Sequence, residues 1–563
     1  MVIKMITKKS YMIYKRYKQF IPYLTFLLIG FLFFPSAGRD DVHITYWAAY
    51  TLSNFGEIVN YNGDRVEQSS SLLHTLVLAG IHYISKANIV SIGSFLSIFF
   101  GLVTINLTGK LSLLINKEKF FSQIIIATST PFIYWSFGAL EASIVSTIIL
   151  FILLTTIEFS TKTTIRNYIL SLTAIILYLL VRPESFFVIL LFLLITTVIL
   201  FFQKERYIPF IILITTTVVL FLLLLTFRYI YFGAFFPQPV EAKIGMSIIE
   251  KVYSGIFYYK KVFNQYPFFI LLTVPIIIYT TFKITKTIKN RNMFLLISLL
   301  ISYLLFILFS GGDWMEGARF FVPIISLATI IAVSFYVPLL SRKYAIIGGV
   351  FFNVLSTLYF TIMFSTSYPI YNYNNYVIDI SNSKEFSFFE IANRVHYRDI
   401  PFLFEFNSIL KKMTDEGIRP TILSMQAGMV PYHIFQDYYK KAQFIDLFGL
   451  STKDFTNCEV TSSLRRWKYG IAMNYNYFFS HLDALEEKCD IGAPDIIYDI
   501  GKETLNKVNF IKKQGYSLVY LQRGDIINKG VFKGGRVKGV EFIAIKTDIA
   551  IKLQLKIKEF KFR

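Results

Sequence analysis

Residues 207–231 read YIPFIILITTTVVLFLLLLTFRYIY, a long and almost uncharged apolar run. A helix needs about 20 apolar residues to cross the hydrocarbon core of a bilayer, which is about 30 Å thick. The run belongs to a chain of 563 residues, of which 54% are hydrophobic and only 17% are charged. Ordinary soluble domains carry roughly a quarter charged residues. The composition therefore excludes a simple water-soluble protein and places the chain in a membrane.

Other apolar runs along the chain resemble this one in length and in their lack of charge. We therefore predict a polytopic α-helical membrane protein with about 11 transmembrane helices. They are expected at residues 18–35, 88–108, 120–137, 141–159, 167–182, 184–202, 207–231, 266–282, 293–310, 319–340 and 344–364. The apolar stretch Ser71–Ile84 is too short to cross and is predicted to be interfacial or re-entrant.

The basic residues predict the orientation, because Lys and Arg are retained preferentially on the cytoplasmic side. A basic cluster from Lys4 to Lys18 precedes the first span, and Lys117, Arg166 and Lys286 lie in loops that alternation then places inside. With an odd number of spans, the N-terminus is cytoplasmic and everything after residue 364 lies outside. A signal peptide is the other interpretation of residues 1–35, but no A-x-A-like cleavage site follows.

This topology divides the chain into two predicted domains. Residues 1–364 form the transmembrane domain with a large first outer loop at 36–87, and residues 365–563 form an extracytoplasmic domain. Short apolar segments bounded by polar residues predict strands in the second domain, and the segment between the first two predicts a helix. The strands are expected at Thr421–Met425, Gln443–Phe448, Asp495–Tyr498, Ser517–Gln522 and Val540–Ile545, and the helix at Ala427–Tyr439. The pattern favours an α/β domain.

The charge and the cysteines restrict the partners and the compartment. The formal net charge is +21, but the basic residues are scattered between apolar runs rather than gathered on one face, so nucleic acid is not an expected partner. Cys458 and Cys489 both fall in the predicted outer domain. We predict that they form a disulfide that closes a loop of about 30 residues, with two buried free thiols as the alternative.

Polar residues gather where the predicted topology places the outer ends of the spans. They are Asp40 and Asp41, Glu141, Arg182 and Glu184, Lys243, Asp313 and Arg319. Charges at membrane depth cost about 2.5–3.5 kcal/mol each on insertion scales unless they pair or face water. Their convergence on one face predicts a cavity for an anionic lipid, because arginine binds phosphate through short, charge-assisted hydrogen bonds.

Each of these groups also has a purely structural interpretation. The paired carboxylates can accept a proton from a hydroxyl, hold a divalent cation or be solvated boundary charges. Arg182 can form a structural ion pair with a glutamate, Lys243 can extend to the lipid headgroups, and Arg319 can anchor its helix there. The residues alone leave these alternatives open.

The order of the motifs resembles that of bacterial membrane glycosyltransferases of the GT-C superfamily, in particular the branch that contains the mycobacterial terminal arabinofuranosyltransferase. The first-loop patterns of that branch are similar to Asp40–Ala49 and Asn60–Ser69. Four later motifs have similar segments before residue 364: G-L-E-T at Ala139–Ala142, R-P-E at Arg182–Glu184, Y-G-x-x-x-P-N-x-x-x-A-K at Phe232–Lys243 and G-G-D-x-M-x-x-x-R-F-x-x-P at Gly311–Pro323. Two more have similar segments in the predicted outer domain: A-G-x-[IV]-P-Y at Ala427–Tyr432 and [VI]-D-x-x-G-L at Ile445–Leu450.

Three positions depart from the family pattern. Trp47 stands where the family has an arginine, His43 where it has an aromatic residue, and His74 where it has a tryptophan. These changes put any substrate contact from Trp47 and His43 in doubt. The two histidines lie in separate segments, so ordinary hydrogen-bonded histidines are favoured over a metal pair.

The resemblance implies transfer of a sugar from a polyprenyl-phosphate donor to a hydroxyl of a cell-envelope glycan, glycolipid or protein, with inversion at the anomeric carbon. It places the reaction at the outer face of the cytoplasmic membrane, among membrane lipids. The roles that follow are Asp40 or Asp41 as the catalytic base, Arg319, Arg182 and Lys243 near the donor phosphate, and Glu141, Glu184 and Asp313 as orienting groups. The sequence identifies no cofactor, and whether a divalent cation joins the acidic pair is left open.

A flippase or transporter of lipid-linked glycans is the alternative, because it too requires many spans and charges within the membrane. Transporter folds usually contain two related halves with broken helices near the midplane. The sequence has no such halves, and its polar groups gather at one face. A glycosyltransferase is therefore the favoured prediction.

Overall fold

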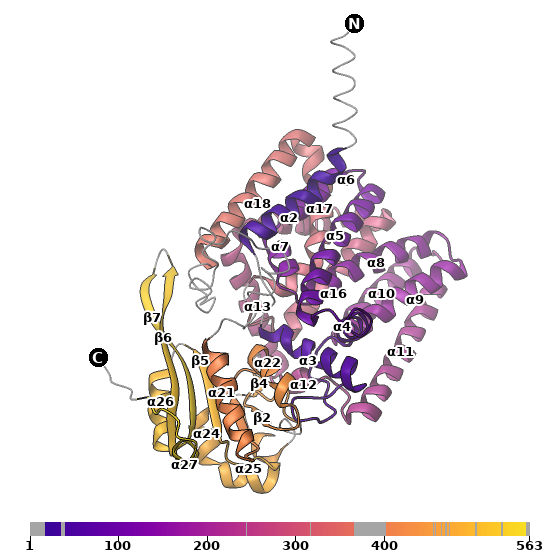
Figure 1. Ribbon diagram of the computed structural model, residues 1–563. Helices are drawn as coiled ribbons and strands as arrows, with labels where there is room; N and C mark the ends of the chain where they lie inside the picture. The colour runs from indigo at the N-terminus through magenta and orange to yellow at the C-terminus, as the bar shows by residue number, and fades with distance from the viewer. Residues whose placement is uncertain are drawn as a thin grey trace. The chain divides into compact units, whose positions relative to one another are not determined.

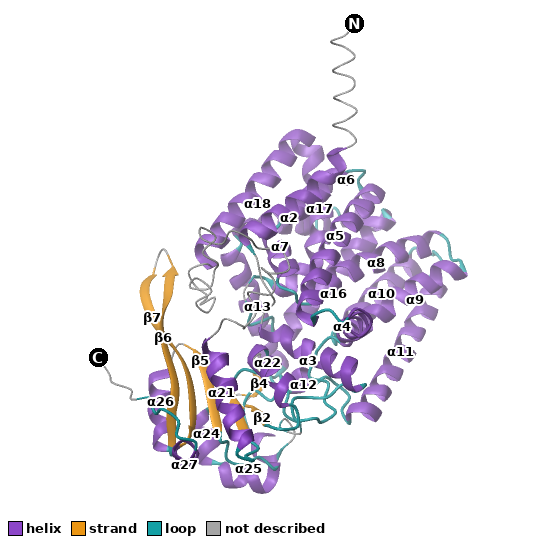
Figure 2. Cartoon of the chain, in the orientation of Figure 1, coloured by secondary structure: helices purple, strands orange, loops and turns teal. Residues whose placement is uncertain are grey.

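The computed structural model describes residues 17–34, 40–243, 245–315, 317–364, 401–453, 455, 458–462, 464, 466–467, 470–471, 473–501, 504–530 and 533–558. Most of the basic cluster that precedes the first span lies outside these ranges. The chain forms two compact units. The first unit comprises Met1–Ser36, Ser94–Leu223 and Ile248–Thr361, and the second unit comprises Ala37–Gly93, Leu224–Ser247 and Ile362–Arg563. The first unit is helical, whereas the strands belong to the second (Figures 1 and 2).

The units do not follow the order of the chain. The first outer loop and residues 224–247 are grouped with the C-terminal residues, and the unit boundaries fall inside helices α5 and α11. The division into a transmembrane domain at 1–364 and an outer domain at 365–563 describes membrane topology and stays a prediction.

The helices of the first unit are interrupted twice by segments of the second unit, between α2 and α5 and between α11 and α13. They are η1 (Lys18–Phe20), α2 (Ile21–Phe33), α5 (Ile89–Ile115), α6 (Lys119–Ala127), α7 (Thr130–Phe137), α8 (Ala142–Thr161), α9 (Ile165–Val181), α10 (Ser185–Phe202), α11 (Ile208–Phe232), α13 (Ile248–Gln265), η2 (Pro267–Phe269), α14 (Ile270–Thr280), α15 (Ile284–Lys289), α16 (Arg291–Ser310), η3 (Arg319–Phe321), α17 (Val322–Leu340) and α18 (Arg342–Phe364).

Within the described residues, six of the predicted spans coincide with helices that are long and apolar enough to cross a membrane, namely α5, α8, α10, α11, α16 and η3 with α17. Three more coincide with the shorter apolar helices α2, α9 and α14, and the span expected at 344–364 lies in α18. The span expected at 120–137 is divided into α6 and α7. Pro131 lies in the first turn of α7, where it has no N–H to donate to the preceding turn.

Helix α8 lies at the centre of the first unit and contacts α7, α9, α16 and α17. Small hydroxyl residues let it pack closely against α5. The Ser97 and Ser143 hydroxyls are 3.2 Å apart, and the Thr104 and Thr147 hydroxyls are 2.8 Å apart. Small and hydroxylated residues are typical of helix contacts within membranes, because the backbones approach closely and the hydroxyls bond across the interface.

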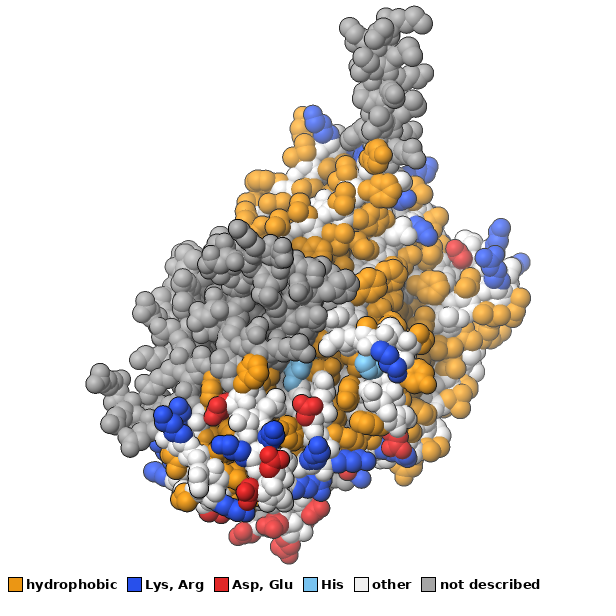
Figure 3. Space-filling model, viewed as in Figure 1, with side chains coloured by type: hydrophobic (Ala, Val, Ile, Leu, Met, Phe, Trp, Pro, Cys, Tyr) orange, Lys and Arg blue, Asp and Glu red, His pale blue; other side chains and the backbone are white. Residues whose placement is uncertain are grey.

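Large apolar side chains are exposed on the first unit. Leu24, Phe202 and Leu223 are 63%, 75% and 61% exposed, respectively. In the space-filling view, hydrophobic side chains cover most of the visible helical surface (Figure 3). Water-soluble monomers rarely expose contiguous apolar patches of this extent. The surface of the first unit is therefore suited to contact with lipid.

The second unit combines two helices of the first outer loop with an α/β region. Its helices are α3 (Asp40–Phe55), α4 (Leu72–Ser85), α12 (Gln238–Glu241), α21 (Pro401–Asp415), α22 (Met429–Tyr438), α23 (Glu459–Ser462), α24 (Tyr475–Ser480), α25 (Leu482–Cys489), α26 (Thr504–Lys513) and α27 (Thr547–Lys552). Its strands are β1 (Thr421–Ser424), β2 (Gln443–Asp446), β3 (Arg466–Trp467), β4 (Gly470–Ile471), β5 (Ile496–Gly501), β6 (Tyr516–Gly530) and β7 (Lys533–Lys546). The predicted interfacial stretch Ser71–Ile84 corresponds to α4, and the Ser71 hydroxyl caps this helix by accepting the His74 amide.

The main sheet has the strand order β2-β1-β5-β7-β6. Strand β1 pairs in parallel with β2 and β5, whereas β7 pairs antiparallel with β5 and β6. Helix α22 connects β1 to β2, so the predicted β–α–β start is confirmed. The short β3–β4 pair was not predicted. Ser424 and Asp446 are register partners at the carboxyl ends of β1 and β2, so the chain leaves both strands at the same end of the sheet.

Helices cover both faces of this sheet. Ile445 and Ile497 belong to a core that includes Val508 and Ile511 of α26. The alternate strand residues point to the opposite face, where the Phe444 ring lies 6.1 Å from the Phe435 ring of α22. On the same face, Tyr498 contacts Phe406 of α21, with ring centroids 5.3 Å apart. The predicted α/β class of this region is therefore confirmed.

Cys458 and Cys489 form a disulfide, as predicted. Replacing both with serine is expected to destabilise the α/β region by about 3–4 kcal/mol, because the bridge restricts the unfolded chain. Thermal unfolding of the oxidised wild-type protein and of the double-serine variant measures this difference. Thiol labelling of denatured, unreduced protein provides the control, since two reactive thiols per chain would show that the bridge is absent.

Candidate functional site

The acidic pair, Asp40 and Asp41, opens helix α3. Carboxylates in the first turn of a helix are stabilised by the positive end of its dipole. Both residues are partly exposed. The two candidate bases therefore lie in the first turn of an ordered helix.

Asp40 is held by the segment that follows strand β1. Its Oδ1 accepts a hydrogen bond from the Met429 amide, with N and O 2.7 Å apart. Gly428, the N-cap of α22, lies directly against Asp40. A Cβ atom at residue 428 would lie 2.1 Å from the Asp40 backbone oxygen and 2.7 Å from its Cγ. Residue 428 must therefore lack a side chain if Asp40 is to keep its position.

The surroundings of Asp40 favour its protonated form. Although the residue is partly exposed, its carboxyl group is enclosed by protein atoms. Burial, the charge of Asp41 and, to a smaller extent, Asp446 raise the pKa of Asp40, whereas the Met429 amide lowers it, and together they bring it to about 7. A carboxyl group with a pKa near the working pH is suited to general acid–base catalysis, because both of its protonation states are populated.

The first outer loop is fixed to the α/β region by a turn at Asn60–Asp64. The Asn60 side chain accepts the amides of Asn62 and Asp64, with N–O distances of 3.0 and 2.8 Å, and donates to the Ser451 carbonyl at 2.9 Å. Gly63 completes the turn with φ +93°, a conformation that other residues rarely adopt. The loop motif that resembles the family pattern thus positions polar side chains for docking.

Two neighbouring side chains of this turn extend the contact. The Asn62 amide group accepts from the Phe444 N–H at 2.7 Å and donates to the Phe444 carbonyl at 3.0 Å, as a paired strand would. The Tyr61 hydroxyl donates to the Ala427 carbonyl at 2.8 Å. The first outer loop is therefore bonded both to Ala427, next to the segment that holds Asp40, and to Phe444 of strand β2.

A buried ion pair anchors the end of the same loop. Glu67 and Arg228 form two hydrogen bonds of 2.7 and 3.0 Å, with side chains only 4% and 2% exposed. Arg65, by contrast, forms an exposed pair with Glu57. The buried pair of Glu67 with Arg228 is therefore suited to hold the loop, whereas the exposed pair of Arg65 with Glu57 contributes little. Arg228 was missed from the sequence, because it is the charged residue inside the run 207–231.

The two departures from the family pattern in α3 are explained by packing. Trp47 is fully buried and contacts the rings of Tyr50 and Tyr61 at 5.5 and 5.0 Å. His43 contacts the rings of Tyr46 and Tyr432 at 5.1 and 5.4 Å. Both positions thus belong to an aromatic core between α3 and α22, which a charged side chain at residue 47 would disturb.

The first unit brings together five of the predicted site residues, which we call the arginine cluster: Glu141, Arg182, Glu184, Asp313 and Arg319. Arg182 lies at the end of α9 and pairs with two carboxylates, at 2.5 Å to Glu141 and 2.8 Å to Glu184. All three side chains are at most 12% exposed. The structural ion pair considered from the sequence is therefore present, and it fixes the guanidinium in a rigid position.

Arg319 is oriented by Asp313, which accepts its Nε and Nη2 groups at 2.6 and 3.0 Å. The Phe320 ring lies beside both arginines, with centroid distances of 5.7 Å to the Arg182 guanidinium and 5.4 Å to that of Arg319. The ion pairs of Arg182 and that of Arg319 therefore form one cluster. Phe320 was not predicted as a site residue, although it follows Arg319 directly in the family pattern.

Lys261 is another residue that the sequence did not single out. Its ammonium group donates to the Trp314 carbonyl at 3.0 Å, within the turn that carries Asp313 and Arg319. The predicted phosphate ligand Lys243 instead lies in the second unit, in the turn after α12, and is partly buried. Lys243 thus belongs to the same unit as Asp40 and Asp41.

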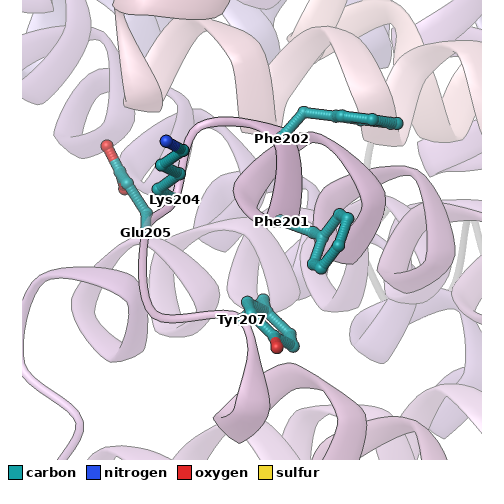
Figure 4. Close-up of a pocket in the computed structure, with 5 residues that line it drawn as sticks. All are labelled: Phe201, Phe202, Lys204, Glu205 and Tyr207. Atoms are coloured by element: carbon teal, nitrogen blue, oxygen red, sulfur yellow. The ribbon is translucent and has the colours of Figure 1, made fainter.

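The described residues contain no group of three or more His, Cys, Asp or Glu side chains arranged to hold a metal ion. A pocket at the turn between α10 and α11 is lined by Phe201, Phe202, Lys204, Glu205 and Tyr207 (Figure 4). In it, the Phe201 and Tyr207 rings are 5.2 Å apart. The pocket contains none of the predicted site residues and belongs to a loop that the predicted topology places in the cytoplasm.

Comparison with known proteins shows the fold. No family model and no curated protein matches the chain. The structure is similar to the Archaeoglobus fulgidus oligosaccharyltransferase in complex with Zn and sulfate, with TM-score 0.52 and 11% identity over 92% of this chain and 72% of that one. ArnT from Cupriavidus metallidurans bound to undecaprenyl phosphate is matched with TM-score 0.48 and 10% identity over 94% and 98% of the two chains. The first likeness confirms the predicted GT-C type of fold, while the arabinofuranosyltransferase branch stays a prediction.

Proposed function

We propose that the protein is a membrane glycosyltransferase. It transfers a sugar from a polyprenyl-phosphate donor to a hydroxyl of a cell-envelope glycan, glycolipid or protein. The observation that carries the proposal is Asp40, an enclosed carboxyl group with a pKa of about 7, fixed by the Met429 amide at the start of α3. The GT-C type of fold and the order of motifs, which resembles that of the family, support it.

The proposed reaction is a single displacement with inversion. Asp40 or Asp41 removes the proton of the acceptor hydroxyl while its oxygen attacks the anomeric carbon. The bond between that carbon and the donor phosphate breaks, and the polyprenyl phosphate leaves with the electron pair. Developing negative charge on the phosphate requires cationic groups nearby, and such preorganised charges are usually a large part of catalysis.

We assign these cationic roles to Arg319, Arg182 and Lys243, and the orienting roles to Glu141, Glu184 and Asp313. A guanidinium has five N–H donors in a planar fork, and Asp313 accepts two of those of Arg319. The carboxylates of the cluster would thus fix the arginines before a donor phosphate binds. Because little reorganisation is needed on binding, the affinity for the phosphate is increased.

The test of the proposed function is transfer by the purified, full-length protein in detergent. Synthetic polyprenyl-phosphate sugars serve as donors and envelope glycans as acceptors, with formation of the extended glycan measured by mass spectrometry. In parallel, a deletion strain should accumulate the donor and lack one sugar residue in a surface glycan. Donors that remain intact in both experiments would contradict a transferase.

Arg319→Lys is expected to raise the KM for the donor by about 10- to 100-fold, because one point charge replaces a planar fork that makes charge-assisted hydrogen bonds. The catalytic constant should change less than KM. Arg291→Lys is the matched control, since Arg291 of α16 forms a half-exposed pair with Glu205 outside the cluster. Equal donor affinities in the two variants would remove Arg319 from the phosphate site.

We propose that the protein lies in the cytoplasmic membrane with its N-terminus inside and its C-terminal region outside. A reporter that is active only outside the cell membrane, fused after residue 400, is expected to be active. A fusion at Lys286 should be silent, because that residue follows the predicted inner end of a span. The reverse pattern would invert the topology and with it the assigned side of the reaction.

A further inference from the structure

We infer that the α/β region supplies a positioning element for the reaction, in which Gly428 and the Met429 amide hold Asp40 in place. This inference rests on the proposed function, because it assigns Asp40 a catalytic role. Neither residue is a catalytic residue, since both act through Asp40. The α/β region is then a part of the reaction centre and more than an appended domain.

The first argument is the closeness of the contact. The Met429 N–H is the first amide of α22 and points at Asp40 Oδ1 over 2.7 Å. Such an amide has no partner within its own helix, so it can bond an external acceptor without loss of helix structure. Gly428 has φ −97°, outside the left-handed region. Glycine is therefore needed here because Asp40 occupies the space that a Cβ atom would take.

The second argument is that this segment is itself fixed. Tyr61 donates to the Ala427 carbonyl, and Asn60 and Asn62 bond to the turn after β2 and to β2 itself. Helix α22 packs against α3 through Trp47 and Phe435, whose rings are 6.4 Å apart. Because this segment is rigid, it keeps Asp40 in a fixed position, and a preorganised site requires this.

The third argument concerns charge. The groups that face Asp40 are Asp41 on its own helix, Asp446 at the end of β2, and the phenols of Tyr61 and Tyr498. Negative charges on Asp41 and Asp446 disfavour a further negative charge on Asp40. The Met429 amide acts in the opposite direction and stabilises the carboxylate. Removal of this amide should therefore raise the pKa of Asp40 above about 7.

Gly428→Ala tests the steric part in the full-length protein. The added methyl group must displace Asp40, and turnover is expected to fall by at least about 10-fold, since small misplacements of a catalytic group are costly. Gly80→Ala is the matched control: Gly80 is an exposed glycine in α4, and a Cβ there meets no atom within 4 Å. It should keep wild-type turnover. Equal turnover in the two folded variants would overturn the inference.

Met429→Pro tests the amide, because proline lacks the N–H yet is tolerated at the first position of a helix. Its turnover–pH profile should move upward by about one unit, with a larger loss at pH 6 than at pH 9. Met429→Leu keeps the amide, and its pH profile is the matched comparison. A uniform loss at every pH, with an unmoved inflection, would indicate only a structural role and overturn the inference.

Hydrogen exchange distinguishes failure of the inference from failure of the proposed function. In the wild-type protein the Met429 amide should be protected, and Asp40→Ala should lift that protection at the start of α22 whether or not the protein is active. Unchanged exchange would overturn the contact. If the contact is present but the wild-type protein transfers no sugar, the proposed function is wrong, and the catalytic role of the contact is rejected with it.

Discussion

Asp40→Asn is expected to lower the rate of sugar transfer by at least about 10²-fold, the low end for the loss of a general base. Asparagine keeps the shape of the side chain and can still accept the Met429 amide, but it cannot take a proton. The pKa of Asp40 is about 7, so wild-type turnover should rise through neutral pH as the carboxyl group ionises. This rise should be absent in the variant.

The stability of the Asp40→Asn variant distinguishes loss of the catalytic base from misfolding. The pKa of Asp40 is raised on folding, so the protonated form is favoured in the folded state. The resulting stabilisation is complete below the unfolded pKa of about 3.9 and is lost as the pH rises through about 7. A neutral asparagine cannot ionise, so Asp40→Asn should be at least as stable as the wild-type protein at pH 8.

Asp41→Asn is the companion variant, and its effect identifies which carboxylate is the base. Removal of the Asp41 charge should also lower the pKa of Asp40, because that charge raises it. If both variants retain near-normal transfer at normal expression, the base lies elsewhere. Glu141 or Asp313 would then be the next candidates.

Arg228→Met is expected to destabilise the protein by about 3–5 kcal/mol, because it leaves the buried Glu67 carboxylate without its partner. Thermal unfolding in detergent and the yield of monodisperse protein measure the loss. Arg65→Met is the matched control, since it removes an arginine of the same loop whose pair with Glu57 is half exposed. It should have little effect.

The double variant Glu67→Met/Arg228→Met distinguishes the loss of a pair from the loss of packing. Replacing both charges with apolar side chains of similar size is often neutral, whereas breaking a buried pair is not. The double variant should therefore recover most of the stability that Arg228→Met loses. An equally unstable double variant would show that the arginine contributes through other contacts.

The sequence predicted the local features of the fold well, because hydropathy and alternation are local signals. The run at 207–231 became α11, and Thr421–Met425 became β1. The break of the 120–137 span was missed, although Pro131 was visible, because apolar composition continues through it. Turns at single prolines within apolar runs are not distinguished by hydropathy alone.

The candidate site was predicted less completely, because its contacts join distant segments. The motif order indicated Asp40, but nothing in the sequence connects it to Met429, 389 residues away. Arg228 was hidden in an apolar run, and its partner Glu67 is 161 residues earlier. The arginine cluster was indicated because its charges lie at the predicted outer ends of the spans, whereas Phe320 is apolar and Lys261 lies outside the predicted spans and motifs.

The pairing of Asn62 with Phe444 has a consequence for how the α/β region can exist apart from the rest of the chain. Strand β2 is the edge of the main sheet, and Asn62 occupies the N–H and C=O of Phe444 on its open side. Exposed edges recruit strands from other molecules and lead to aggregation. A fragment that begins at residue 401 would lose this cap and expose the edge, so the region is a dependent part of the chain and a poor candidate for transfer to other proteins.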